Sequence, residues 1–169
     1  MGKKIRLAGI AYESLVNGPG IRRVFFSQGC KHNCPGCFNP ETHDFNGGQE
    51  VPLEEIMKKV KDNCETGLID GITFSGGDPM EHPLELEEIA KLVHSFGLTV
   101  WSFTGYTYEK ILESESKRRL LENLDVLIDG KFDQTKCEEG LKFRGSSNQR
   151  IIDVQKSLKD NTVVMYEVR

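Results

Sequence analysis

The chain has 169 residues, of which 37% are hydrophobic and 28% charged, and its formal net charge at pH 7 is −4. This length suits one domain with a buried core and is short for two, so we expect a single domain over residues 1–169. The negative charge disfavours a nucleic-acid binder that depends on phosphate contacts. No apolar stretch approaches the roughly 20 residues of a membrane span. We therefore expect one soluble, cytoplasmic domain that binds neither nucleic acid nor membrane.

The first half of the chain predicts two strands followed by a helix. Residues 5–12 are mixed apolar and extended, residues 16–20 have turn chemistry, and residues 21–27 are rich in strand-forming side chains. Pro52 is well suited to open a helix, with acidic residues in its first turn. The apolar residues of this helix recur at helical spacing and predict its buried stripe: Leu53, Ile56, Met57, Val60 and Cys64.

The second half alternates strands and helices. Strands are predicted at 71–75, 98–104 and 125–129, with a helix from Pro83 between the first two and a helical segment from 107 to about 123, interrupted near Ser114. Residues 131–148 are predicted as loop, and 150–154 and 163–168 as final strands. This alternation predicts an α/β fold of parallel βα units, as a doubly wound sheet or an open, partial barrel.

Polar or glycine-rich segments follow four of the predicted strands. They are the segment after residue 27, Gly76-Gly77-Asp78, Thr104-Gly105 and Asp129-Gly130. Because the carboxyl ends of parallel strands share one edge and ligands bind there, we expect these segments to surround one site.

Three cysteines, Cys30, Cys34 and Cys37, lie within eight residues in what we call the cysteine loop (residues 30–37). A structural zinc site needs four closing ligands, and a ferredoxin-type iron–sulfur site also uses four cysteines. Three thiols with no fourth nearby favour a 4Fe–4S cluster in which one iron lacks a protein thiolate. Such an open position is typical of a metal centre that does chemistry on a ligand.

Other interpretations of the cysteines remain open. His32 or the better placed His43 would complete a Cys3His zinc site. A disulfide framework fits poorly, because five cysteines is an odd count, no secretory signal is evident, and disulfides are rare in reducing compartments. We expect Cys64 to be buried on its helix and Cys137 to be a surface thiol in a polar loop.

The second motif is Gly76-Gly77-Asp78-Pro79. Adjacent glycines let a backbone pass very close to a ligand, and the Asp78 carboxylate can accept hydrogen bonds from an ammonium group. Alone, such a turn is structural more often than not. Beside the cysteine loop it suits a ligand with an amino-acid head, such as S-adenosylmethionine, whose amine and carboxylate can chelate the open iron.

These two motifs together resemble the radical S-adenosylmethionine superfamily. Within it the chain closely resembles the activating proteins of anaerobic (class III) ribonucleoside-triphosphate reductases. Gly36, where other members of the superfamily usually have an aromatic residue, is usual in this family and favours it over the activases of pyruvate formate-lyase. The matching runs are residues 16–22, 34–42, 101–106, 129–132 and 144–150.

The resemblance implies a partial, TIM-like barrel of the radical S-adenosylmethionine type and assigns roles within it. Each cysteine of the loop would ligate one iron of a 4Fe–4S cluster, and no catalytic residue is expected beyond these ligands. The backbone of Gly36, Cys37 and Phe38 would run beside the adenine, and Gly76, Gly77 and Asp78 would hold the methionine amine.

The implied function is the activation of an anaerobic ribonucleotide reductase. An electron from the cluster would cleave S-adenosylmethionine into methionine and a 5′-deoxyadenosyl radical, which would abstract hydrogen from a glycine of the reductase to leave a glycyl radical. The cofactor carries this chemistry and the protein supplies placement and exclusion of water. The implied partners are the large subunit of the reductase and an electron donor such as flavodoxin or ferredoxin.

Several interpretations stay open at this level. Asp129 is a candidate contact to the ribose or methionine, or a plain turn carboxylate. The run from Arg144 to Arg150 would meet the partner's glycine loop or the ligand carboxylate, or form a turn. Rival functions are activation of another glycyl-radical enzyme, a non-catalytic iron–sulfur electron carrier and a zinc scaffold, although the last two give Gly76-Gly77-Asp78 no role.

Overall fold

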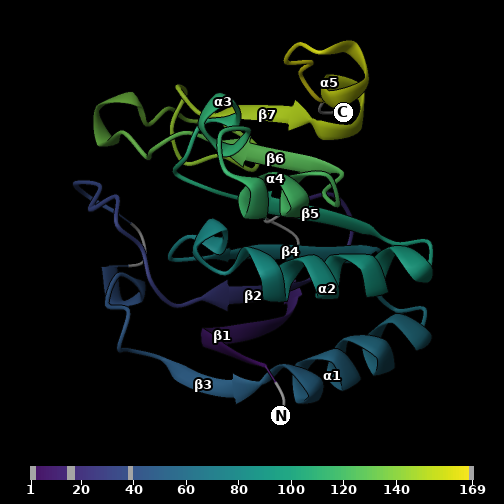
Figure 1. Cartoon of the computed structure of the whole chain (residues 1–169). Helices are drawn as coiled ribbons and strands as arrows, with labels where there is room; N and C mark the ends of the chain where they lie inside the picture. The colour runs from purple at the N-terminus through teal and green to yellow at the C-terminus, as the bar shows by residue number, and fades with distance from the viewer. Residues whose placement is uncertain (1–2, 15–17, 38–39, 168–169) are drawn as a thin grey trace.

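One mixed sheet organises the protein in a computed structural model that describes residues 3–14, 18–37 and 40–167. Over these residues the sheet has seven strands in the order β3-β1-β2-β4-β5-β6-β7 (Figure 1). The strands are β1 (Lys4–Ser14), β2 (Arg22–Ser27), β3 (Gln49–Pro52), β4 (Gly71–Gly76), β5 (Thr99–Phe103), β6 (Val126–Asp129) and β7 (Arg150–Asp153). The α-helices are α1 (Leu53–Glu65), α2 (Pro83–Ser95), α3 (Tyr108–Ile111), α4 (Glu115–Leu121) and α5 (Val154–Asp160).

The predicted parallel core is confirmed. Strands β2, β4, β5 and β6 are parallel neighbours, and helices connect β4 to β5 and β5 to β6. Strand β1 pairs antiparallel with β2 and β3, and β7 pairs antiparallel with β6. The connection from β6 to β7 contains only the short 3-10 helix η3 (Gln134–Lys136) and not the α-helix that usually carries a parallel crossover. The sheet ends at β3 and β7, so it is open.

Two parts of the sequence prediction were wrong or incomplete. The predicted strand at 163–168 is absent from the described part of that range, where Met165 forms only an isolated bridge to Ile152. Helix α5 occupies the preceding segment, and Asp153 caps it by accepting a hydrogen bond from the Lys156 amide. Strand β3 was not predicted, because its residues are largely exposed and its register comes from pairing with β1.

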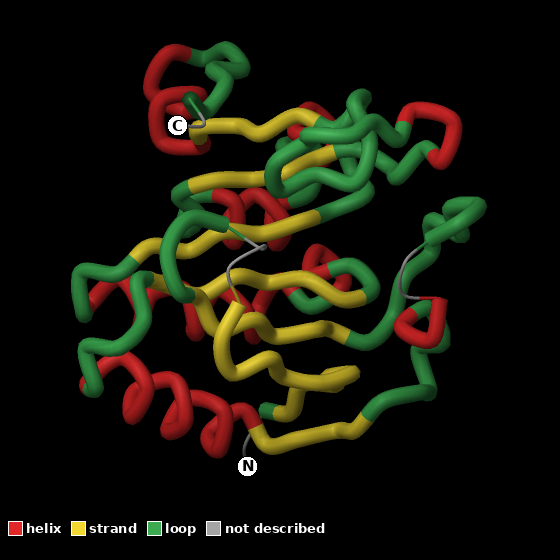
Figure 2. The backbone as a smooth tube through the Cα atoms, turned by 180° about the vertical axis from the view of Figure 1, so that it is seen from behind, coloured by secondary structure: helices red, strands yellow, loops and turns green. Residues whose placement is uncertain are grey.

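Helices cover one face of the sheet, and loops cross the other. Helices α1, α2 and α4 cover one face (Figure 1), where their apolar stripes build the main core with residues such as Ile56, Val60, Ile89 and Phe74. The other face, seen in Figure 2, is crossed by loops instead. A smaller core there contains Trp101, Val126, Ile128 and Ile151, with Phe103, Phe143 and Tyr166 packed against it. Among the described helices, none combines the length and apolar character that crossing a bilayer requires.

Candidate active site

The ends of the parallel strands meet around one cavity of about 180 Å³. It lies on the loop-covered side, since Phe103 of the smaller core lines it. Four segments that the sequence predicted to converge all contribute: the cysteine loop, the end of β4, the end of β5 and the turn after β6. The lining residues are Cys30, His32, Cys34, Cys37, His43, Ser75, Gly76, Gly77, Phe103, Thr104, Gly105, Gly130, Phe132, Gly145 and Gln149.

All three cysteines of the cysteine loop line this cavity as free, partly exposed thiols. Burial raises the pKa of Cys30 to about 11, and a hydrogen bond from the His32 backbone partly offsets it. Burial also raises the pKa of Cys34, against a hydrogen bond from the Phe132 backbone. Three thiols facing one cavity are the donor set that an iron–sulfur cluster with one open iron requires, so the residues present fit that group.

The cysteine loop is fixed by backbone hydrogen bonds at its start. The amide of Gly29 donates to the Thr42 carbonyl over 2.7 Å, and that of Cys30 donates to the His43 carbonyl over 3.2 Å. The side-chain amide of Gln28 donates to the carbonyls of Glu41 and Asp44. These hydrogen bonds hold the start of the loop against residues 41–44, and this limits how far Cys30 can move.

The histidines considered for a zinc site have separate environments. Nε2 of His43 lies 3.3 Å from the Sγ of Cys37, as expected for the better placed candidate. His32 instead directs Nε2 at the carboxylate of Asp78. Over the described residues, no three or more His, Cys, Asp or Glu side chains are grouped closely enough to hold one metal ion.

The two glycines at the end of β4 bring its backbone directly against the residues that flank the cysteine loop. Gly76 has φ +104°, and a Cβ there would collide with the backbone of Ser27. A Cβ on Gly77 would lie 2.5 Å from the Gly29 carbonyl oxygen and 2.6 Å from that of Thr42. The Gly77 amide donates to the Ser27 carbonyl over 2.8 Å. Only glycine permits this approach, and it leaves a backbone edge on the cavity wall.

Asp78 does not line the cavity. Its side chain is fully buried and accepts hydrogen bonds from Nε2 of His32 at 2.6 Å, the Thr104 hydroxyl at 2.9 Å and the Gly105 amide at 2.9 Å. It also caps the 3-10 helix η2 (Pro79–Glu81) by accepting from the Met80 amide. The direct contact with a ligand amine stays a prediction, and it requires one of these bonds to be released.

The Asp129 carboxylate is also hydrogen-bonded to other residues and does not line the cavity. Asp129 is 1% exposed, and its carboxylate accepts from the Tyr108 amide at 2.7 Å and from Nε and Nη2 of Arg150 at 3.0 and 2.6 Å. These bonds raise the pKa of Arg150, as does its pairing with Glu109. Asp129 therefore joins β6, β7 and the start of α3, while Gly130 after it reaches the cavity.

The remaining predicted site residues are Gly36, Phe38 and the run from Arg144 to Arg150. Gly36 has φ +73° and is not in the lining, and Phe38 lies outside the described residues. Arg144 donates to the carbonyls of Ser147 and Gln149 and so shapes a turn. The side chain of Gln149 accepts from the Gly145 amide and donates to the Gly130 carbonyl, which ties this turn to the cavity.

Sequence reasoning missed Ser75, Phe103 and Phe132 as lining residues. Ser75 and Phe103 belong to strands whose convergence was predicted. Alternation along each strand was the available signal for the side that their side chains face. Phe132 lies within a loop, where no periodicity indicates its direction.

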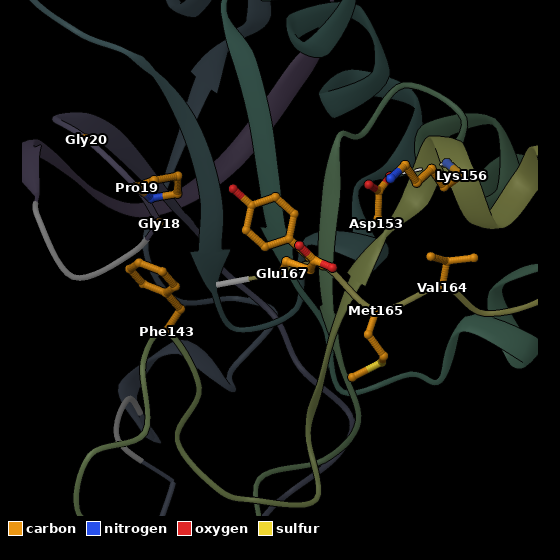
Figure 3. A pocket seen from close by; sticks show the side chains of 10 residues that line it. Gly18, Pro19, Gly20, Phe143, Asp153, Lys156, Val164, Met165 and Glu167 are labelled. Atoms are coloured by element: carbon orange, nitrogen blue, oxygen red, sulfur yellow. Dashed lines mark hydrogen bonds between the residues drawn. The ribbon is translucent and has the colours of Figure 1, made fainter. Parts of the chain in front are cut away.

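A larger cavity of about 740 Å³ lies at the opposite end of the parallel strands. Figure 3 shows Pro19 and Phe143 on one side of it and Asp153 with Lys156 on the other. It contains none of the predicted site residues. Phe143 and Tyr166, which line it, make edge-to-face contacts with Trp101.

Comparison with known proteins places the chain among related sequences. Residues 16–152 match the model of a 4Fe-4S single cluster domain. The anaerobic ribonucleoside-triphosphate reductase-activating protein of Vibrio cholerae is 39% identical over 143 residues, covering 81% of this chain and 90% of that protein. Its counterpart in Escherichia coli is 38% identical over 143 residues, covering 80% and 90%, and that of Enterobacteria phage T4 is 38% identical over 141 residues, covering 80% and 86%.

Among solved structures, QueE from Escherichia coli gives a weak likeness, with a TM-score of 0.48 and 11% identity over 75% of this chain and 71% of that one. The relatives at 38–39% identity span most of the chain, as does the cluster domain. The chain therefore belongs to the family of anaerobic ribonucleoside-triphosphate reductase-activating proteins and carries a 4Fe–4S single cluster domain.

Proposed function

We propose that the protein activates an anaerobic ribonucleoside-triphosphate reductase by reductive cleavage of S-adenosylmethionine at a 4Fe–4S cluster. The observation that carries this proposal is the single cavity that three free cysteines share with the Gly76-Gly77 backbone edge. Family membership supports the reaction and the partner, since relatives covering most of the chain are named for that reductase.

A cluster held by the cysteine loop would supply the one electron that cleaves S-adenosylmethionine into methionine and a 5′-deoxyadenosyl radical. That radical would take a hydrogen atom from a glycine of the reductase to give 5′-deoxyadenosine and a glycyl radical. In this proposal Cys30, Cys34 and Cys37 hold three irons and leave the fourth open to the ligand. The donor set of the cavity supports it.

Backbone groups do most of the ligand positioning in this proposal. The edge at Gly76 and Gly77 receives the methionine part, and the stretch from Gly36 through Cys37 to Phe38 runs beside the adenine. We assign Asp78 and Asp129 to the same site through the segments they hold, because their buried carboxylates are engaged with other groups. A ligand buried between the Gly76-Gly77 edge and the stretch from Gly36 to Phe38 would also be shielded from water, which protects a reactive intermediate.

The whole chain acts as one radical S-adenosylmethionine domain, and its open sheet serves as a partial barrel. Four adjacent parallel strands with one cavity at their carboxyl ends support this reading. An open sheet cannot close its own cavity, so the reductase supplies the missing wall and inserts its glycine loop there. The loop over residues 131–149 is the proposed rim, since Phe132, Gly145 and Gln149 line the cavity. A flavodoxin or ferredoxin supplies the electron, and the reaction takes place in the cytoplasm.

The test is anaerobic reconstitution with iron and sulfide, followed by dithionite and S-adenosylmethionine. We expect 5′-deoxyadenosine from the wild type and from Cys64→Ala, which removes a thiol outside the cysteine loop, and none from Cys34→Ala. Adding the reductase should produce a glycyl radical detectable by electron paramagnetic resonance. A cluster-loaded wild type that forms no 5′-deoxyadenosine would contradict the proposal. A radical formed on another glycyl-radical enzyme in preference to the reductase would favour the rival activase function.

A further inference from the structure

The carboxylate of Asp78 is fully occupied by donors from four residues in three segments of the chain. His32 comes from the cysteine loop, Thr104 and Gly105 follow β5, and Met80 lies in η2. An ionised carboxylate offers about four lone-pair sites. With four donors already present, no free acceptor remains for a ligand amine.

His32 is the unusual member of this set, because it lies between two cysteines of the cysteine loop. Its side chain is 7% exposed, and its Nε2 lies 2.6 Å from Oδ2 of Asp78. Since a carboxylate only accepts, Nε2 carries the hydrogen in this bond. A bond from a ring N–H to an ionised carboxylate is short and among the stronger hydrogen bonds in proteins.

The surroundings hold the His32 ring in one orientation. Its ring packs edge-to-face on Tyr106 with the centroids 4.6 Å apart. A Cβ on Gly105 would lie 2.6 Å from Nε2 of His32, so only glycine leaves room for the ring. Tyr106 is itself anchored by its hydroxyl to Glu81, which also pairs with Lys31 of the cysteine loop at 3.6 Å. The loop is therefore attached to the strand ends at two neighbouring points.

We propose that His32 and Asp78 form a positioning pair that sets the distance between the cysteine loop and the Gly76-Gly77 edge. His32 connects the segment between Cys30 and Cys34 to the residue directly after that edge. The cluster ligands and the ligand-binding backbone are thereby held as one unit. This inference rests on the proposed function, and it assigns Asp78 a role through the loop rather than through contact with S-adenosylmethionine.

The test compares His32→Phe, Asp78→Asn and the double variant with the wild type. His94→Phe is the matched control, because His94 makes the same kind of bond to Asp125, at 2.7 Å, near the opposite end of the strands. Two quantities are measured on reconstituted protein: the rate at which an iron chelator removes the cluster without S-adenosylmethionine, and the dissociation constant for S-adenosylmethionine. The electron paramagnetic resonance spectrum of the reduced cluster is recorded as well.

Loss of one charge-assisted hydrogen bond should speed cluster removal about tenfold and weaken S-adenosylmethionine binding to a similar degree in both single variants. The double variant should be no worse than the worse single variant, because both changes weaken the same interaction: His32→Phe removes the donor and Asp78→Asn removes the charge of the acceptor. The reduced-cluster spectrum should change in these variants. His94→Phe should lower thermal stability alone and leave rate, affinity and spectrum at wild-type values.

Three outcomes would overturn the pair. One is an unchanged cluster-removal rate in His32→Phe. Another is weakened S-adenosylmethionine binding in Asp78→Asn but not in His32→Phe, which would make Asp78 a direct ligand contact. The third is additivity in the double variant. A wild type that holds a cluster but binds no S-adenosylmethionine would instead count against the proposed function, and the cluster-removal rates would still decide the role of the pair.

Discussion

The ion pair between Asp129 and Arg150 should be a large single contributor to the stability of the strand ends. Replacing Arg150 by Met keeps most of the side-chain volume and removes the charge. It leaves the Asp129 carboxylate, which is 1% exposed, with the Tyr108 amide as its remaining donor among these contacts. Removing one partner of a buried ion pair costs about 3–5 kcal/mol, because the other charge stays buried.

The geometry of the Asp129–Arg150 pair narrows the range of about 3–5 kcal/mol expected for its loss. Two hydrogen bonds join the pair, at 3.0 and 2.6 Å, and bonds to charged groups each contribute about 1.5–3 kcal/mol. The Arg150 side chain is 33% exposed, so water can reach the carboxylate once the guanidinium is gone. We therefore expect Arg150→Met to lower the free energy of unfolding by about 3 kcal/mol. This value is the low end of the range for a buried ion pair and equals two hydrogen bonds of about 1.5 kcal/mol each.

Urea unfolding of the cluster-free, reduced protein, followed by circular dichroism, measures this loss. Glu109→Gln is the control, because it removes the other carboxylate that Arg150 contacts, which is 59% exposed. An exposed pair of this kind contributes at most about 1 kcal/mol. If Arg150→Met lost no more than Glu109→Gln, the claim that Asp129 depends on Arg150 would be refuted.

Three further predictions concern the cluster, the strand edge and acid stability. Alanine at any cysteine of the cysteine loop should remove or degrade the roughly 400 nm absorbance of the reconstituted cluster, whereas Cys64→Ala and Cys137→Ala should keep it; loss in the Cys137 variant would contradict the ligand assignment. Gly77→Ala should displace the cysteine loop and reduce iron bound per chain, while Gly9→Ala, where a Cβ meets nothing within 4 Å, should not; equal iron content in both would show that the backbone adapts. A hydrogen bond from Lys91 and a nearby arginine lower the pKa of Glu87, so its stabilising contribution is complete above the ordinary glutamate value of 4.5 and is lost as pH falls through the lowered pKa. Glu87→Gln should therefore flatten the loss of stability on acidification below about pH 5, measured by urea unfolding at several pH values, and an unchanged acid limb would rule out this contribution.

Local pattern predicted the elements that carry their own periodicity. On α1 the residues Leu53, Ile56, Val60 and Cys64 are buried, as the spacing indicated, and Met57, predicted in the same stripe, is partly buried. The break near Ser114 was also predicted, and its hydroxyl caps α4. By contrast β3 is short and exposed, so its pairing with β1 is a tertiary property that no local pattern reveals.

The site was predictable as far as topology determines it. Parallel strands bring their carboxyl ends to one edge, and the segments predicted to meet there line one cavity. The directions of the two carboxylates were not predictable in this way. Each depends on a partner distant in sequence, His32 for Asp78 and Arg150 for Asp129, and only the folded structure brings those partners together.

The placement of these carboxylates has an electrostatic consequence for the cavity. Its described lining contains cysteine, histidine, serine, threonine, glutamine, glycine and phenylalanine, and neither aspartate nor glutamate. Asp78 and Asp129 lie behind that wall, each with a donor side chain, His32 or Arg150, directed at it. Nearby negative charge lowers the reduction potential of an iron–sulfur centre, because net charge and hydrogen bonding tune that potential. The donors of Asp78 include His32, Thr104 and Gly105, which line the cavity, so hydrogen bonds at the wall partly neutralise this charge. Burial and, to a smaller degree, the same charge still raise the pKa of Cys30 and Cys34, so the fold reduces the opposition of Asp78 to electron uptake at the cysteine loop without removing it.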